Sequence, residues 1–219
     1  MNSRSALLLL ILMVGIVCAW GQVRGIDVSK YQGTINWEKV AESKKVKYVY
    51  IKATEGASLK DPMYKKNLKG ARDEGLPVGS YHLYSSKTTA YQQMDNFKAV
   101  VNKKQQDLIP VLDIEEHHSY NLNIARVDKI LEIMEKTYGV KPIIYTSEHV
   151  YDMHFKGKKY ANYKFFIANY RRTPQVPYTL WQYSQTGKVA GISGYVDFSE
   201  LHPKTKLSML KLPKKTDKE

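Results

Sequence analysis

The stretch Leu108-Ile109-Pro110-Val111-Leu112-Asp113-Ile114-Glu115-Glu116 begins as an apolar run of strand length and ends abruptly in acids. In a strand, residues two apart share a face, so Asp113 and Glu115 would point the same way. Their α-carbons would lie about 6.5 to 7 Å apart, from a rise of about 3.3 Å per residue. Repulsion and partial burial should separate their pKa values, so that one carboxyl holds a proton near neutrality while the other is ionised. Such a pair suits acid-catalysed hydrolysis; the alternative is two solvated acids at a strand end or a helix N-cap.

Two more acids stand in a similar setting. Asp27 lies in the run Val23–Val28, and Asp197 lies between Gly194 and Phe198, each as a lone charge among apolar, β-branched or aromatic residues. A buried acid without a purpose would cost several kcal/mol, on the order of the penalty for an unpaired polar group. We therefore expect Asp27 and Asp197 to belong to the same site as the first pair.

Strand-like runs alternate with helix-like stretches, which favours an α/β fold with crossover helices. The expected strands are Val23–Val28, Tyr48–Lys52, Val78–Leu83, Ile109–Asp113, Pro142–Thr146, Phe165–Asn169, Thr179–Tyr183 and Tyr195–Phe198. The expected helices are Trp37–Ser43, Tyr64–Glu74, Ala90–Asn102 and Asn123–Tyr138. Eight strands predict a closed, TIM-like barrel, irregular in its last third because too little chain remains there for full helices. Barrel enzymes carry their chemistry at the carboxyl ends of the strands, where all four acids are expected.

The domain organisation follows from the two ends of the sequence. Residues 1–21 carry Arg4 ahead of an apolar run and small residues near Gly21, as in a signal peptide, which predicts a secreted or periplasmic protein. The run is shorter than the roughly 20 residues that a membrane-spanning anchor needs. Cys18, the only cysteine, lies in this segment; bulky Val17 before it argues against lipidation. The catalytic barrel would cover 22–203, and the lysine-rich residues 204–219 predict a loosely ordered tail.

The formal net charge of +13 predicts an affinity for polyanions. No nucleic-acid-binding signature accompanies the scattered lysines, so an anionic cell-wall surface is the better expectation than nucleic acid. His117 and His118 follow the central acids, but no metal-ligand spacing such as His-Glu-X-X-His is present. We expect no metal, no cofactor, no stable membrane insertion after signal cleavage, and a monomer.

Six motifs together resemble the glycoside hydrolase family 25 lysozymes, also called Chalaropsis-type muramidases. The resemblance covers about Val23 to Leu201, and its motifs follow the family's order. They are Gly25-Ile26-Asp27-Val28-Ser29, Lys52-Ala53-Thr54-Glu55-Gly56, Gly79-Ser80-Tyr81-His82, Pro110-Val111-Leu112-Asp113-Ile114-Glu115, Trp181-Gln182-Tyr183 and Val196-Asp197-Phe198.

This resemblance implies an irregular β/α barrel that cleaves the β-1,4 bond between N-acetylmuramic acid and N-acetylglucosamine in peptidoglycan. By position, Glu115 looks like the general acid/base and Asp113 like its partner, with Asp27 and Asp197 as further acids of the site. A 2-acetamido substrate can supply its own nucleophile, which Asp113 would then assist. The residues alone do not tell a retaining from an inverting outcome.

Aromatic and amide side chains near the expected strand ends would suit a sugar groove. We expect stacking or hydrogen bonding to the sugar from Tyr81, His82, Tyr145, Tyr170, Trp181 and Gln182. The sequence departs from many relatives at Leu83-Tyr84-Ser85-Ser86 and at Phe165–Tyr170, so contacts with the sugar could differ.

Two alternative functions remain at this point. The chain could be a wall-binding barrel without turnover, although the four acids argue against it. It could also be a chitinase-like N-acetylglucosaminidase, a family with a longer ladder of alternating acids. Here Val111 and Ile109 stand where that ladder would continue.

Overall fold

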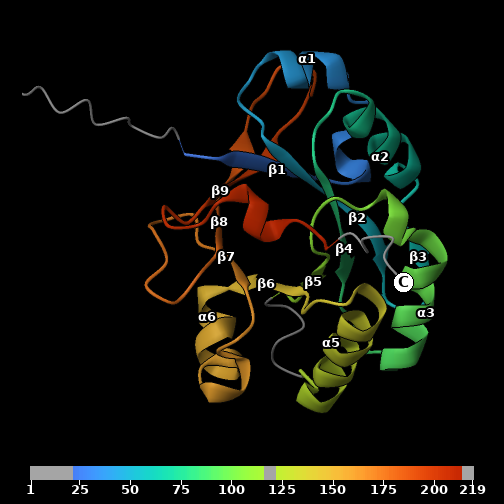
Figure 1. Cartoon of the computed structure of the whole chain (residues 1–219), viewed down its shortest axis with the longest axis vertical. Coiled ribbons are helices and arrows are strands. Elements are labelled where there is room, and N and C mark those ends of the chain that lie inside the picture. The colour runs from blue at the N-terminus through green and yellow to red at the C-terminus, as the bar shows by residue number, and fades with distance from the viewer. Residues whose placement is uncertain (1–21, 116–121, 214–219) are drawn as a thin grey trace, which may run out of the picture.

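A computed structural model describes residues 22–115 and 122–213 of the chain. Its strands form one closed ring in the order β1-β9-β8-β7-β6-β5-β4-β2, which the β1–β2 pair completes (Figure 1). The strands are β1 (Arg24–Val28), β2 (Tyr48–Glu55), β4 (Val78–Leu83), β5 (Val111–Asp113), β6 (Ile143–Ser147), β7 (Phe165–Ala168), β8 (Leu180–Gly187) and β9 (Val196–Leu201). The expected barrel is thus confirmed. A short strand not expected from the sequence, β3 (Leu59–Lys60), pairs with the end of β2 outside the ring.

The last strand runs against its neighbours. The pairs from β1–β2 through β7–β8 are parallel, whereas β9 is antiparallel to both β8 and β1. Asp197 was expected at a strand end but lies near the start of β9. Because β9 is reversed, its start lies at the same mouth as the carboxyl ends of the other strands.

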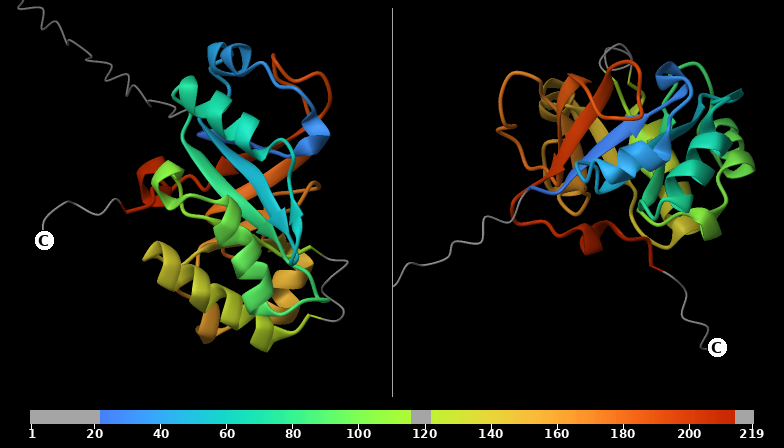
Figure 2. Two further views of the ribbon diagram at one scale, coloured as in Figure 1. Left: turned by 90° about the vertical axis from the view of Figure 1, so that its right-hand side faces the viewer. Right: turned by 90° about the horizontal axis from the view of Figure 1, so that it is seen from above.

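Helices cover the outside of the barrel over its first two thirds. They are α1 (Trp37–Glu42), α2 (Tyr64–Asp73), α3 (Ala90–Val100) and α5 (Ile124–Tyr138), each ending within two residues of its expected bounds. Helices α2 and α3 pack on β2, and α3 packs beside α5 (Figure 2). The side chain of Asn123 caps the start of α5, and Gly139, with φ 75°, ends it in the left-handed conformation.

After β6 the helical layer becomes thin, as expected. Only α6 (Glu148–Val150) follows β6, continuing into a π-helical turn over Tyr151–Phe155 and a 3-10 turn over Lys158–Tyr160. The strands β7, β8 and β9 are joined by loops. This leaves the mouth of the barrel bordered by loops on the β6–β9 side.

Two apolar layers hold the fold together. The outer layer fills the space between the barrel wall and the helices, whereas the inner one fills the barrel and includes Tyr48 and Tyr50. These two rings lie over glycines of the adjacent strands: a Cβ on Gly25 would lie 2.1 Å from a Tyr48 ring carbon, and one on Gly79 would lie 2.3 Å from a Tyr50 ring carbon. The interior is therefore a packed core below the mouth rather than an open channel.

The expected loose tail is wrong for residues 204–213. The 3-10 turn over Leu207–Leu210 crosses the end of the barrel opposite the mouth, where fully buried Leu210 joins the inner core (Figure 2, right). Backbone hydrogen bonds join Ile109 N to Leu210 O and Leu212 N to Asp107 O, both at 2.8 Å. The many lysines of this segment suggested a loose tail, but its apolar residues at 207, 210 and 212 make the contact with the barrel.

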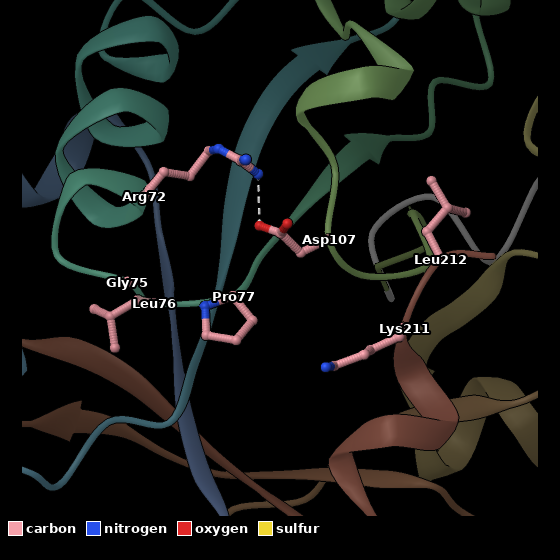
Figure 3. A pocket seen from close by; sticks show the side chains of 7 residues that line it. All are labelled: Arg72, Gly75, Leu76, Pro77, Asp107, Lys211 and Leu212. Carbon is pink, nitrogen blue, oxygen red and sulfur yellow. Dashed lines mark hydrogen bonds and ion pairs between the residues drawn. The ribbon is translucent and has the colours of Figure 1, made fainter. Parts of the chain in front are cut away.

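A surface pocket of about 490 Å³ lies beside this C-terminal segment (Figure 3). Arg72 and Asp107 form an ion pair of 2.6 Å across it, and Lys211 extends into it from the segment. The pocket lies at the amino ends of the strands, away from the four acids.

Several expectations concern residues outside the described ranges. These are the signal peptide over residues 1–21 with Cys18, the histidines His117 and His118, and the last residues of the chain. Within the described ranges, no helix has the length and apolar character needed to cross a bilayer.

Candidate active site

The four acids predicted from the sequence line one pocket at the mouth of the barrel. Its volume is about 60 Å³, and its other lining residues are Tyr50, Tyr81, Val111, Tyr145, Phe166 and Gln182. The acids come from three strands: Asp27 from β1, Asp113 and Glu115 from the end of β5 and just beyond, and Asp197 from β9. Closure of the ring is thus what brings distant parts of the sequence together.

Asp113 and Glu115 both face this pocket, as the two-residue spacing predicted. Asp113 is 7% exposed, whereas Glu115 is half-buried. Burial, and secondarily the charge of Glu115, raises the pKa of Asp113 well above its usual range. Its Oδ1 is buried and has no hydrogen-bond partner among the described residues. A group presented in this way can take a polar hydrogen of a bound substrate.

Asp27 and Asp197 face each other across the β1–β9 pair, where they are register partners. Burial raises the pKa of Asp27 well above its usual range, the charge of Asp197 adds to this, and a hydrogen bond from Gln182 opposes it. Burial, together with the charge of Glu115, raises the pKa of Asp197 to about 6. The pKa values of Asp27, Asp113 and Asp197 are thus all raised, which favours bound protons on these carboxyls at mildly acidic pH.

Gln182 orients the pocket through three hydrogen bonds. The hydroxyls of Tyr145 and Tyr170 donate to its Oε1 at 2.7 and 2.6 Å, and its Nε2 donates to Asp27 Oδ1 at 3.1 Å. Because both tyrosines fix the carbonyl end of the amide, the NH₂ end must face the acid. Tyr145, Gln182 and Tyr81 line the pocket, while Tyr170 stands 46% exposed at its edge.

Lys52, which was not predicted as a site residue, stands beside the acids. This buried lysine donates from Nζ to Glu55 Oε2 at 2.8 Å, and its charge partly opposes the rise of the pKa of Asp113. Both residues belong to the Lys52–Gly56 motif. A lysine directly after the apolar run Tyr48–Ile51 was the available signal, since lysine is almost never buried without a partner.

Two predicted residues lie elsewhere. His82 is on the opposite face of β4 from Tyr81 and is fully buried, where its Nδ1 lies 2.7 Å from Thr54 Oγ1 and its Nε2 lies 3.2 Å from Gln93 Oε1. Trp181 points away from the pocket that Gln182 lines, and its Nε1 donates to Asn169 O at 2.8 Å. The alternation of faces along each strand explains both positions. We withdraw His82, which is fully buried, from the expected sugar contacts, whereas a sugar contact of the partly exposed Trp181 stays a prediction.

A wider pocket of about 530 Å³ adjoins the first and shares Glu115 and Tyr145 with it. Its walls come from the ends of β6 and β7, from α6 and from the loop that follows β7. The remaining lining residues are Ser147, Glu148, His149, Ala168, Asn169, Tyr170 and Arg171. The site as a whole is therefore a narrow acidic pit that opens sideways into a broader groove.

A group of three or more metal-ligating side chains suited to hold an ion is not found in residues 22–115 and 122–213. The expectation that the reaction needs no metal stays a prediction.

The comparisons with known proteins agree with this arrangement. Residues 26–192 match the family model described as Glycosyl hydrolases family 25. The chain is 36% identical over 187 residues to the uncharacterized protein YegX of Escherichia coli strain K12, which covers 81% of this chain and 68% of the relative. It is 33% identical over 196 residues to Lysozyme M1 of Streptomyces globisporus, covering 80% and 66%. The crystal structure of the bacterial lysozyme from Streptomyces coelicolor superposes with a TM-score of 0.76 at 28% identity, covering 87% of this chain and 96% of that one.

Proposed function

This chain belongs to glycosyl hydrolases family 25 and is a peptidoglycan hydrolase of the lysozyme type, and from that premise we propose how its residues perform the reaction. The bond cleaved is the β-1,4 bond between N-acetylmuramic acid and N-acetylglucosamine. The observation that carries the proposal is the convergence of Asp27, Asp113, Glu115 and Asp197 on one pocket. Paired carboxyls at a glycosidic bond are the usual machinery of glycoside hydrolysis.

Glu115 is proposed as the general acid and then the general base. It is more exposed than Asp113 and lines both pockets, so it can reach the oxygen between two sugars that occupy them. In the first step the glycosidic C–O bond breaks and the leaving oxygen takes the proton of Glu115. In the second step the Glu115 carboxylate accepts a proton from the attacking water.

Asp113 is proposed to assist the acetamido group of the substrate. Its unpartnered Oδ1 can accept the acetamido N–H, which stabilises the ionised carboxylate that burial disfavours. The polarised amide oxygen then forms a bond to the anomeric carbon as the leaving group departs, giving a cyclic intermediate that water opens. Asp27, held by Gln182, and Asp197 would stabilise the positive charge that develops on the sugar.

Glu115→Gln provides the test of this assignment. The amide has nearly the same shape but cannot donate the proton, so hydrolysis of purified sacculi should fall by a factor of about 10² to 10⁴. Turbidity loss and zymography measure the rate, and an unchanged melting temperature shows that the variant is folded. A Glu115→Gln protein that digests sacculi at the parent rate would contradict the assignment.

Product analysis separates the alternatives. Mass spectrometry of reduced muropeptides identifies the reducing-end sugar, which is muramic acid for a muramidase and glucosamine for a chitinase-like enzyme. A wall-binding barrel without turnover would bind sacculi and release neither.

We propose that the protein acts outside the cytoplasmic membrane, where peptidoglycan lies. Because the substrate lies outside the cytoplasmic membrane, export through residues 1–21 would bring the enzyme to it. The net charge of +13 would attract the chain to the anionic wall.

A further inference from the structure

The groove beside the catalytic pocket contains an arginine whose charge is unmatched. Arg171 lines this groove together with Glu115 and Tyr145 and is exposed. Its guanidinium forms no ion pair and no hydrogen bond with any residue of the described ranges. The neighbouring Arg172 differs, because its Nη2 lies 3.1 Å from Glu148 Oε1.

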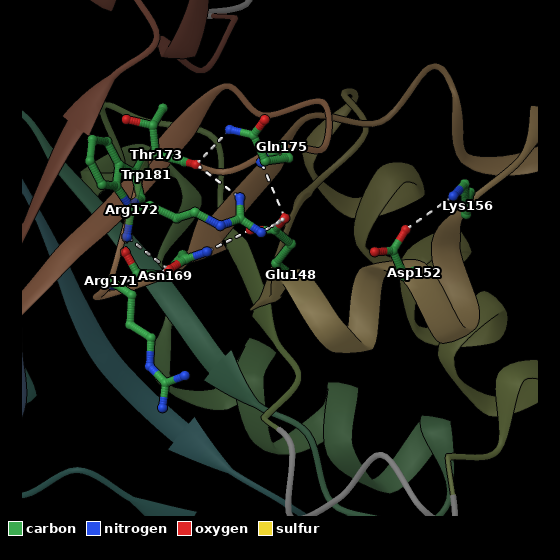
Figure 4. Close-up of polar contacts among 9 residues, drawn as sticks. All are labelled: Glu148, Asp152, Lys156, Asn169, Arg171, Arg172, Thr173, Gln175 and Trp181. Atoms are coloured by element: carbon green, nitrogen blue, oxygen red, sulfur yellow. Dashed lines mark hydrogen bonds and ion pairs between the residues drawn. The ribbon is translucent and has the colours of Figure 1, made fainter.

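The loop that carries Arg171 is held from several sides. The side chain of Asn169 donates to Glu148 Oε2 at 2.6 Å and accepts from the backbone N–H groups of Arg171 and Arg172 at 3.1 and 3.2 Å. Its backbone oxygen accepts from Trp181 Nε1, and Gln175 N donates to Glu148 Oε1 at 3.2 Å. Figure 4 shows this network and the side chain of Arg171 pointing away from it.

This arrangement prepares Arg171 for a ligand. The network neutralises Arg172 and fixes the backbone, so the remaining cation projects from a rigid base into a groove of about 530 Å³. Ordering of the loop is therefore not a cost of binding. Guanidinium groups recognise carboxylates through two parallel hydrogen bonds, which makes a carboxylate the matching ligand.

We propose that this groove binds a carboxylate carried by the muramic acid residue of the substrate, and that Arg171 is the specificity-determining residue that pairs with it. The inference rests on the proposed function, which places muramic acid next to Glu115. Muramic acid differs from glucosamine by a lactyl ether that ends in a carboxyl group. In the intact wall that carboxyl is amide-linked to a stem peptide, which carries carboxylates of its own.

The first experiment compares Arg171→Met with the parent on three soluble glycans. One carries stem peptides, one has been stripped by an amidase so that only the lactyl carboxylate remains, and one has been stripped and then amidated with carbodiimide and ammonia. On a carboxylate-bearing glycan, kcat/KM of the variant should fall about tenfold or more, through KM, since charge-assisted hydrogen bonds are worth about 1.5 to 3 kcal/mol. On the amidated glycan, the parent and Arg171→Met should have nearly the same kcat/KM.

The pattern across the three glycans identifies the carboxylate. If Arg171→Met lowers kcat/KM on both charged glycans, Arg171 also pairs with the lactyl carboxylate where that group is free. If kcat/KM falls only on the glycan with stem peptides, Arg171 pairs with a carboxylate of the stem peptide. An equal defect on all three glycans, or none on any, overturns the proposal. Lys47→Met is the matched control, because it removes one exposed charge just before the amino end of β2, at the end of the barrel opposite the mouth. Arg171→Lys should recover part of the loss.

A binding measurement keeps this test separate from that of the proposed function. Calorimetry with a disaccharide-peptide fragment is performed on Glu115→Gln and on Glu115→Gln/Arg171→Met, neither of which needs to turn over. The second protein should bind about tenfold more weakly, and equal affinities would refute the role of Arg171. Absence of hydrolysis by the parent would instead refute the proposed function, whatever the binding result.

Discussion

Asp113 is the residue whose proposed role has the most specific consequence. Asp113→Asn removes the charge that polarises the acetamido group, so the rate on sacculi should fall by about 10² to 10³, the range for loss of one preorganised electrostatic contact. For the parent enzyme, proton NMR should show a product that initially keeps the β configuration. Intact-protein mass spectrometry should show no attached sugar during turnover. An initial α product, or a sugar-modified peptide containing Asp113, would contradict neighbouring-group assistance.

The raised pKa of Asp197 predicts how the free energy of unfolding depends on pH. Its pKa is about 6 in the folded protein against an ordinary value of 3.8, so the folded state binds more protons between these values and loses stability as pH rises through them. A difference of about two pKa units corresponds to about 3 kcal/mol at most. Asp197→Asn should therefore be more stable than the parent above pH 6, by about 1 to 3 kcal/mol, and no different below about pH 4.

Urea unfolding at pH 4, 5, 6 and 7.5 measures this difference. Glu42→Gln, which alters an exposed acid on α1, is the control and should follow the parent at each pH. A stability gain of Asp197→Asn that is the same at all four values would rule out titration of Asp197 as its cause.

At the scale of elements, the C-terminal segment should contribute strongly to stability. Leu210 is fully buried in the inner core, whereas its neighbour Met209 is 54% exposed. Leu210→Ala should lower the free energy of unfolding by about 2 to 5 kcal/mol, the range for large-to-small changes in a core, and Met209→Ala should change it by less than about 0.5 kcal/mol. Chemical unfolding measures both values. Equal small effects would show that the segment does not close the barrel.

Strands and long helices could be predicted from the sequence because their signals are local. The apolar periodicity of Ile124–Tyr138 and the β-branched runs around Asp27 and Asp113 indicate the elements directly. The reversal of β9 could not be predicted in this way, since strand direction depends on how the barrel closes. Residues Leu207–Leu210 were likewise missed, because a short turn that fills a gap in a core has no period of its own.

The candidate site was predictable to the same degree. Acids at strand ends stand out from their apolar neighbours, so all four were found. Aromatic, histidine and amide side chains do not stand out from their neighbours in this way. Adjacent residues of a strand also lie on opposite faces, so an error of one position selects the wrong side chain. Tyr81 and Gln182 line the pocket, whereas His82 and Trp181, their direct neighbours, do not.

For the whole molecule, the surface charge should affect capture of the wall more than the chemistry. Exposed lysines far from the pocket, such as Lys44 and Lys45, attract an extended anionic polymer over distances that salt screens, with a Debye length of about 8 Å at physiological ionic strength. Activity on intact sacculi should therefore fall as sodium chloride rises from 50 to 300 mM. Activity on a short soluble fragment should change much less. The same salt dependence for both substrates would contradict a role of the distributed charge.

The antiparallel closing strand also makes the site depend on synthesis of the whole barrel. Tyr48 and Ser199, whose hydroxyls lie 3.0 Å apart inside the barrel, are 151 residues apart in the chain. Until β9 has left the ribosome, β1 lacks one of its two partners and Asp27 lacks the acid that faces it. Contacts of such long sequence separation form late and slowly. A nascent chain would hence carry no working site, and the enzyme could not attack a glycan before its folding is complete.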